Sequence, residues 1–277
     1  MNDLSYAVLG PDPAATAVAA LGLGNLAAGA AILAVVALRP ATRRLAGPAA
    51  AYGLWRLPLL ALAGALLVVL VPRDAESLST AAALASHVPG LGYAVAAWLA
   101  GFAVMAGRIA VAQARFQAEV RAGRAGPAVV GLISPRIVMP ADEADYTAEE
   151  RDLIRAHERA HIARKDPRAA AVAAFFQCAC WFNPLVHLAA FLVRLDQELA
   201  CDAAVVMSRP HARSLYARTL LKTQLAATPL PLGCYWPARG QHPLEVRIGL
   251  LKPRPGQVQP RAEGGIVVAA SIDAIRP

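Results

Sequence analysis

The chain has 277 residues, of which 57% are hydrophobic and only 17% are charged, and its mean hydropathy is +0.45. A water-soluble domain of this length carries about 25% charged residues, so the composition argues against an ordinary cytosolic enzyme, and the high hydrophobicity excludes disorder. The net charge is +8, but the arginines form no dense block of the kind that binds nucleic acid. The composition therefore predicts a protein that lies partly in a lipid bilayer and does not bind nucleic acid.

Three apolar segments predict membrane-spanning helices, at about 14–38, 50–71 and 91–107. The first contains 25 residues without a charge, which is long enough to cross a bilayer as a helix. The second is interrupted only by Arg56, whose long side chain can reach the membrane surface. We expect a multi-pass membrane protein.

The charges beside these segments predict their orientation. Several arginines lie in the 39–46 loop and after Arg108, whereas the 73–90 loop carries two acidic residues against one arginine. Because basic loops stay on the cytoplasmic side, we expect the N-terminus and the 73–90 loop outside, and the 39–46 loop and everything after Arg108 inside.

A β-hairpin is predicted next, from Ala128–Ile133 and Arg136–Met139 on either side of Ser134-Pro135. It could serve to cover a core. It could equally offer an edge strand to an extended peptide.

The following helix is predicted to begin at a capping box of Thr147 and Glu150 and to run to about Lys165, before Pro167. It contains His157-Glu158-Arg159-Ala160-His161, and residues four apart share a helix face, so both imidazoles can reach one metal ion. Zinc lowers the pKa of a bound water to about 7, and a neighbouring carboxylate can take its proton. A charged helix with packed or solvated histidines is the alternative, but these two fall on an apolar stripe where imidazoles need a partner.

A catalytic zinc needs a third protein ligand, and Glu198 is the candidate because it lies beside the apolar stripe of a later helix. Asp202, one turn further on, could accept a hydrogen bond from the distal nitrogen of a ligand histidine. For both carboxylates the alternative is a structural ion pair with Arg194 or another arginine. Tyr216 could donate a hydrogen bond to the tetrahedral oxyanion that forms when the metal-activated water attacks a peptide carbonyl. Packing on a helix is the simpler interpretation of this tyrosine.

The uncharged segment 169–193 is long enough for a fourth span, but crossing would place His157 and Glu198 on opposite sides of the membrane. Asn183-Pro184 lies near its middle, and proline breaks a helix. We therefore predict a helical hairpin over 169–206, from helices 169–182 and 185–206, that either dips into the bilayer or is buried in the domain that carries the metal site.

Together these segments resemble the BlaR/MecR-type membrane zinc metallopeptidases, the peptidase part of antibiotic-sensing signal transducers. The resemblance implies Zn²⁺ bound by His157, His161 and Glu198, with Glu158 as the catalytic base. It also implies a mainly α fold of polytopic membrane helices and a gluzincin-like zinc peptidase domain with a small β-hairpin, facing the cytoplasm at a bacterial inner membrane. The matching segments are GLISPRIVMP (131–140), YTAEERDLIRAHERAHIARKD (146–166), WFNPLVHLAA (181–190), ELACDAAVV (198–206) and, more weakly, LYARTLL (215–221) and EVRIGLL (245–251).

We expect three parts: membrane helices over 1–112, a zinc metallopeptidase domain over 113–252 and an irregular tail over 253–277. The resemblance implies regulated proteolysis of a cytoplasmic protein, such as a transcriptional repressor. The sensor members carry a penicillin-binding domain after the peptidase, whereas no serine here begins an S-x-x-K motif, so acylation by a β-lactam is not expected. Two alternatives stay open: a catalytically silent, zinc-bearing signalling scaffold, and a membrane quality-control peptidase of the heat-shock type that degrades misfolded or prenylated proteins.

Overall fold

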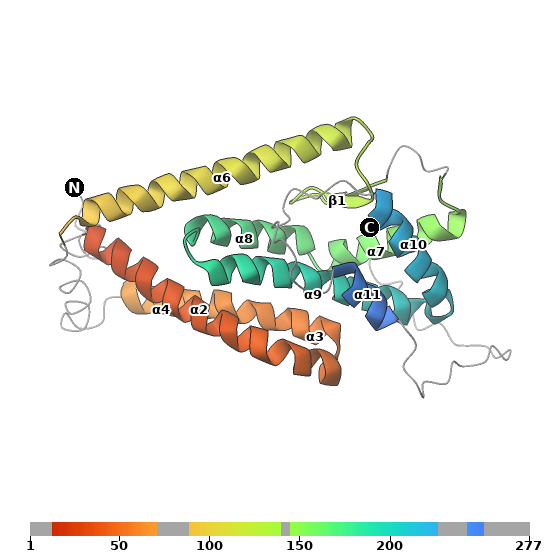
Figure 1. Ribbon diagram of the computed structural model, residues 1–277, viewed down its shortest axis with the longest axis horizontal. Coiled ribbons are helices and arrows are strands. Elements are labelled where there is room, and N and C mark those ends of the chain that lie inside the picture. Colours follow the sequence, from red (N-terminus) through yellow and green to blue (C-terminus); the bar gives the residue numbers. More distant parts are fainter. Residues whose placement is uncertain (1–12, 71–88, 140–144, 227–242, 252–277) are drawn as a thin grey trace.

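A computed structural model describes residues 13–70, 89–139, 145–226 and 243–251. In these residues the protein is mainly α-helical with one small sheet, which confirms the expected fold class (Figure 1). Predictions about the loop from 73 to 88 and the tail from 253 lie outside the described residues. In chain order the elements are α2 (Pro13–Ala46), α3 (Pro48–Gly53), the 3-10 turn η1 (Leu54–Arg56), α4 (Leu57–Leu70), α6 (Leu91–Arg121), β1 (Ala128–Val130), β2 (Arg136–Val138), α7 (Ala148–Ala163), α8 (Asp166–Ala179), α9 (Pro184–Ser208), the 3-10 turn η3 (Pro210–Ala212), α10 (Arg213–Ala226) and α11 (Pro243–Leu251).

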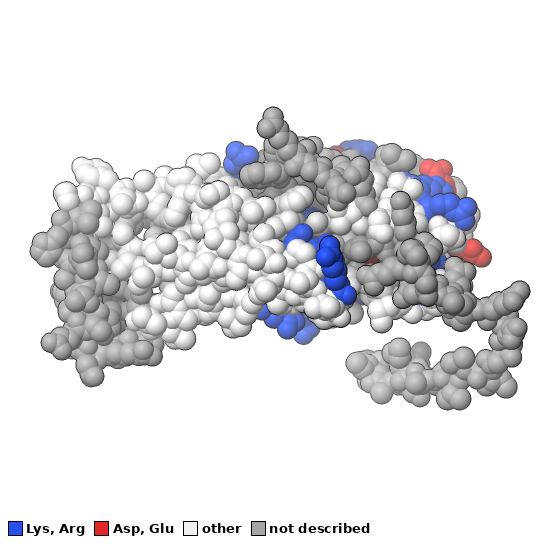
Figure 2. Space-filling model, turned by 60° about the horizontal axis from the view of Figure 1, so that its bottom comes forward, with Lys and Arg blue, Asp and Glu red and all other residues white. Residues whose placement is uncertain are grey.

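Three helical stretches of the described chain are long and apolar enough to cross a membrane, as the sequence predicted: Ala15–Ala46, Pro48–Val68 and Leu91–Arg121. Figure 1 shows these helices extending to one side of the molecule, away from α7, α10 and α11. On the face drawn in Figure 2, the described residues of that side are white, and the lysines, arginines and acidic residues gather over the other half. The charge distribution thus separates a lipid-facing part from a water-facing part.

The prediction of a loop at 39–46 was wrong, because α2 continues as a helix through Pro40 to Ala46. Proline removes one backbone hydrogen bond and normally ends a helix. Here Arg39 and Arg43 are one turn apart and both bind Asp196 of α9, at 3.0 and 2.6 Å. These ion pairs hold the last two turns of α2 in helical form.

The second membrane stretch is broken into α3, η1 and α4 instead of forming one helix. Pro58 explains the break, since its ring clashes with the carbonyl of the residue four positions earlier and it donates no hydrogen bond. That earlier residue is Leu54, where the 3-10 turn begins. The break turns Tyr52 and Trp55 toward the peptidase helices.

Helices α8 and α9 form the predicted hairpin, with the reversal at Asn183-Pro184. The Asn183 side chain caps α9 by accepting from the Leu185 amide at 3.0 Å, and it donates to the side chain of Asn25 in α2 at 3.1 Å. Asn25 precedes Arg39 by 14 residues, which is about 21 Å along a helix. The tip of the hairpin therefore lies beside the apolar part of α2, so the hairpin dips among the membrane helices.

Apolar packing holds the hairpin in this place. Ile32 of α2, Trp55, Phe176 of α8 and Val186 of α9 belong to one buried cluster. On the other side, α6 lies so close to the hairpin that a Cβ at Gly101 would overlap the indole of Trp181. The hairpin is therefore enclosed by the membrane helices on both sides (Figure 1).

The predicted β-hairpin is present but short. Ala128 pairs with Val138 and Val130 with Arg136 in an antiparallel register. Gly131 follows β1 with a φ of +105°, a conformation that L side chains rarely adopt, and a Cβ there would lie 2.6 Å from the Ser134 carbonyl oxygen. The turn thus requires glycine at this position.

The capping box at the start of α7 is confirmed. The Thr147 hydroxyl accepts from the Glu150 amide at 3.2 Å, and the Glu150 carboxylate accepts from the Thr147 amide at 2.8 Å. Lys222 of α10 also binds Glu150, at 3.1 Å. The first turn of the helix that carries both histidines is thereby fixed to α10.

Thr147→Ala is expected to lower the free energy of unfolding by about 1 kcal/mol, because it leaves a helix N-terminal amide without its acceptor. Thr147→Ser, which keeps the hydroxyl, should unfold close to wild type. Thermal unfolding of the detergent-solubilised chain measures the difference. Equal midpoints for the alanine and serine variants would contradict the capping role.

Candidate active site

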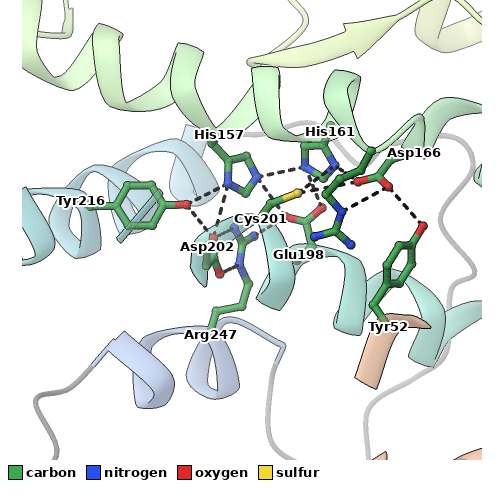
Figure 3. Close-up of polar contacts among 10 residues, drawn as sticks. Tyr52, His157, His161, Asp166, Glu198, Cys201, Asp202, Tyr216 and Arg247 are labelled. Atoms are coloured by element: carbon green, nitrogen blue, oxygen red, sulfur yellow. Dashed lines mark hydrogen bonds and ion pairs between the residues drawn. The ribbon is translucent and has the colours of Figure 1, made fainter. Parts of the chain in front are cut away.

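The two histidines of α7 and Glu198 of α9 converge on one point (Figure 3). The Nε2 atoms of His157 and His161 lie 3.1 Å apart. The Glu198 carboxylate lies 3.3 Å from Nε2 of His157 and 3.7 Å from Nε2 of His161. The structure thus brings together the three residues that the sequence predicts as metal ligands.

These separations fit a tetrahedral metal ion. Zinc bonds of 2.0–2.1 Å to nitrogen and oxygen place tetrahedral ligand atoms about 3.3 Å from one another. The two Nε2 atoms are 3.1 Å apart, and each faces a different oxygen of Glu198, at 3.3 Å from His157 and 3.7 Å from His161, so all three separations lie near this value. Two imidazoles and one carboxylate are also the donor set of a catalytic zinc that keeps a fourth position open.

Arg247 of α11 is a residue of the site that the sequence analysis missed. Its Nη1 lies 3.0 Å from Glu198, and its Nε and Nη2 donate to Asp202 at 2.8 Å each. Burial alone would raise the pKa of Glu198, but the charge of Arg247 and the hydrogen bond with His157 hold that pKa well below its usual value. Glu198 is therefore ionised, as a metal ligand must be. The ion pair left open as an alternative also exists, with Arg247 and not with Arg194 as its partner.

Tyr216 of α10 hydrogen-bonds Nδ1 of His157, the ring nitrogen that faces away from Glu198. This nitrogen lies 2.8 Å from the Tyr216 hydroxyl, and the hydroxyl donates to Asp202 at 2.6 Å. Asp202 was expected to bind a ligand histidine directly, but its oxygen is 3.5 Å from Nδ1 of His157 and Tyr216 makes the shorter contact. With Nε2 turned to the shared point, Nδ1 carries the proton and donates to the tyrosine oxygen. The Tyr216 hydroxyl is thus engaged between two partners, a geometry that favours orienting His157 over donating to an oxyanion.

His161 is held in the same way by Asp166, a second residue that the sequence analysis missed. Nδ1 of His161 lies 2.9 Å from the Asp166 carboxylate, and the residue Asp166 is only 2% exposed. Cys201 lies beside them, with its sulfur 3.5 Å from Nδ1 and 3.7 Å from Asp166. Burial by itself lowers the pKa of His161, but its hydrogen bonds with Asp166 and Cys201 outweigh burial and raise the pKa to about 11. A metal ion would displace a proton from this ring on binding.

The sequence held a signal for both missed residues. Asp166 ends the segment YTAEERDLIRAHERAHIARKD, and Arg247 lies in EVRIGLL, two of the segments that carry the family resemblance. Nothing in the spacing, however, indicates which buried partner each charged residue contacts. Cys201 is buried, as are Cys178 and Cys180, while Cys234 lies outside the described residues.

Glu158 is buried beside the converging ligands, at 8% exposure. Burial raises its pKa, and the nearby His157 and His161 oppose this effect only in part. A carboxylate with a raised pKa accepts a proton more readily than one in water. The electrostatic setting of Glu158 is therefore that of a general base.

The ligands open onto a cavity of about 930 Å³. Apolar side chains of α6 line one side of it, among them Phe102 and Ile109, and strand β1 lines another. His157, Glu158 and Glu198 belong to the same lining. A segment of polypeptide has room to lie against the metal site here.

Residues 113–251, about half of the chain, match the family described as BlaR1 peptidase M56. The chain belongs to this family. It is thus a member of a metallopeptidase family, and its apolar helices place it with the membrane proteins. The resemblance recognised in the sequence motifs is confirmed.

Among curated proteins, the chain is similar to the regulatory protein BlaR1 of Bacillus licheniformis. The two are 31% identical over 97 residues, which is 35% of this chain and 16% of that protein. The chain therefore corresponds to a small part of this relative. No solved structure matches it.

Glu198→Gln is expected to weaken zinc binding by on the order of 100-fold or more, since the loss of a ligand should exceed the 10–100-fold that orienting partners contribute. Zinc titration of the purified chain against a competing chelator measures this. Glu119→Gln is the matched control, because Glu119 lies on α6 and pairs with Arg124, away from the site. Equal zinc affinity in both variants would exclude Glu198 as a ligand.

Proposed function

We propose that the protein is a zinc endopeptidase of the bacterial inner membrane that cleaves a cytoplasmic protein in regulated proteolysis. The convergence of His157, His161 and Glu198, with Glu158 beside them, is the observation that carries the proposal. Its division into membrane helices over 1–112 and a peptidase domain over 113–252 stays a prediction.

The roles of the residues follow from their chemistry. A zinc ion, when bound, supplies Lewis acidity that polarises the scissile carbonyl and makes water a stronger acid. Glu158 takes the proton from the attacking water and delivers it to the departing amine, for which a raised pKa is suited. Tyr216 and Asp166 hold the two imidazoles with Nε2 toward the metal.

Strand β1 is suited to hold the substrate. Within the described residues its sheet partner is β2, and Ala128, Val129 and Val130 also line the cavity beside the metal ligands. An extended peptide can add to the other edge of such a strand through backbone hydrogen bonds. A substrate bound in this way would lie along the cavity in extended form.

The substrate class follows from the relatives. The BlaR1 protein is named as a regulatory protein, and the family resemblance implies cleavage of a repressor. We accordingly propose a repressor-like cytoplasmic protein as the substrate.

The alternative is a silent scaffold that binds the metal through the same residues without turnover. In that case Arg247, 3.0 Å from Glu198, serves only to hold the ligand carboxylate in place. A chain that binds zinc without cleaving any protein would have this function. The experiment on Glu158 separates the two.

Glu158→Gln is expected to retain zinc and to abolish proteolysis, because the amide cannot take a proton from water. Cells that express the wild-type chain or the variant are compared by proteomics, and the substrate is the protein whose fragment occurs only with the wild type. Glu149→Gln is the matched control on the exposed side of the same helix. Cleavage by the Glu158 variant at the wild-type rate would remove Glu158 as the base, and absence of any fragment with the wild type would favour the scaffold.

The proposed orientation is tested by reporter fusions. Alkaline phosphatase is active only outside the cytoplasmic membrane, so a fusion after Arg124 should be inactive, whereas a fusion after Glu76 should be active. The reverse pattern would place the site outside and exclude a cytoplasmic substrate.

A further inference from the structure

The membrane helices contact the candidate metal site through Tyr52 of α3. Its hydroxyl donates to Oδ1 of Asp166 at 3.1 Å, and Oδ2 of the same carboxylate holds Nδ1 of His161 at 2.9 Å (Figure 3). Asp166 is almost completely buried, and Arg164, Gln197 and Cys201 complete the surroundings of its carboxylate. A chain of two hydrogen bonds therefore runs from a membrane helix to a candidate ligand.

Arg164 keeps Tyr52 in this position. Its guanidinium lies 4.4 Å from the centre of the Tyr52 ring, and its Nε lies 3.7 Å from Oδ1 of Asp166. The ring thus has two constraints, one on its face and one on its hydroxyl. Removal of the hydroxyl alone would leave the stacking intact.

A second contact fixes the helix that carries Glu198. Asp196 lies two residues before Glu198 on α9 and is fully buried. It is bound by Arg39 and Arg43 of α2 and, at 2.8 Å, by the indole nitrogen of Trp55. Because a buried carboxylate is costly without its partners, this part of α9 is tied to the end of α2 and to η1.

The two histidines differ in which part of the protein orients their rings. His157 is oriented by Tyr216 and Asp202, which belong to the peptidase region. His161 is oriented by Asp166, and Asp166 is itself held by a residue of the membrane part. The ligand geometry of His161 therefore depends on where the α3 segment lies.

We propose that Tyr52 is a positioning residue for the candidate metal site, and that α3, the first part of the second membrane stretch, sets the metal affinity through Tyr52–Asp166–His161. The inference rests on the proposed metal site and extends it. A displacement of α3 relative to α8 would break the Tyr52 hydrogen bond and loosen His161. The membrane helices would in this way adjust the peptidase without any other change at the site.

The test measures zinc affinity of the full-length chain in detergent, by competition with a chromogenic chelator. Asp166→Asn should weaken binding by about 10–100-fold, as is typical when the partner of a ligand histidine is altered, and Tyr52→Phe, one bond further out, by about 3–10-fold. The double variant should bind no more weakly than Asp166→Asn alone, because Tyr52 acts through Asp166. Tyr93→Phe on α6 is the matched control, since that residue is 85% exposed.

Two further measurements separate positioning from a structural effect. The absorption spectrum of the cobalt-substituted protein reports the ligand geometry, and it should change in Tyr52→Phe while the thermal midpoint stays near that of Tyr93→Phe. A lower midpoint with an unchanged spectrum and unchanged zinc affinity would overturn the inference. So would additive losses in the double variant.

The outcomes also distinguish this inference from the proposed function. A wild-type chain that binds no zinc would overturn both. If the wild-type chain binds zinc and Tyr52→Phe binds it equally tightly, only the positioning role of Tyr52 is overturned.

Discussion

An ionised carboxylate held between helices needs a partner, and four paired carboxylates, three of them buried and Glu198 partly buried, determine how this protein is arranged. Asp166, Asp196, Glu198 and Asp202 all lie at helix contacts, and each binds at least one cationic or hydrogen-bonding group from another helix. Loss of one partner from a buried pair typically costs about 3–5 kcal/mol, so each pairing fixes the relative position of two helices. The apolar contacts around these carboxylates are non-directional, so they constrain the relative position of two helices less than the pairings do.

Three of the four carboxylates lie on α9, which makes this helix the centre of the molecule. Its first half packs against α2 and α8 in the apolar cluster around Ile32. Further along, Asp196 binds the membrane helices, Glu198 faces the histidines of α7, and Asp202 binds α10 and α11. One helix thus carries the contacts to the membrane helices, the candidate metal site and the C-terminal helices in sequence.

The sequence predicted those features that depend on local spacing. The i, i+4 histidines, the capping box of Thr147 and the reversal at Pro184 each arise from a few neighbouring residues, and the structure contains all three arrangements. The approach of Glu198 to α7 followed from the requirement that metal ligands lie on one side of the membrane. By contrast, Tyr52, which binds Asp166, and Asp202, which binds Arg247, lie 114 and 45 residues away from them along the chain, so no local pattern identifies these two contacts. The helix continued through Pro40 for the same reason, since a distant carboxylate stabilised it.

The contact between Asn183 and Asn25 fixes how far along the membrane helices the candidate metal site lies. From this contact α9 runs for 14 residues from Pro184 to Glu198, which is about 21 Å, and α2 covers the same length from Asn25 to Arg39. The two helices cover equal lengths between these contacts, so Glu198 is held level with Arg39, whose side chain binds the neighbouring Asp196. The candidate metal site therefore lies at the depth where the apolar stretch of α2 ends and its first arginines begin.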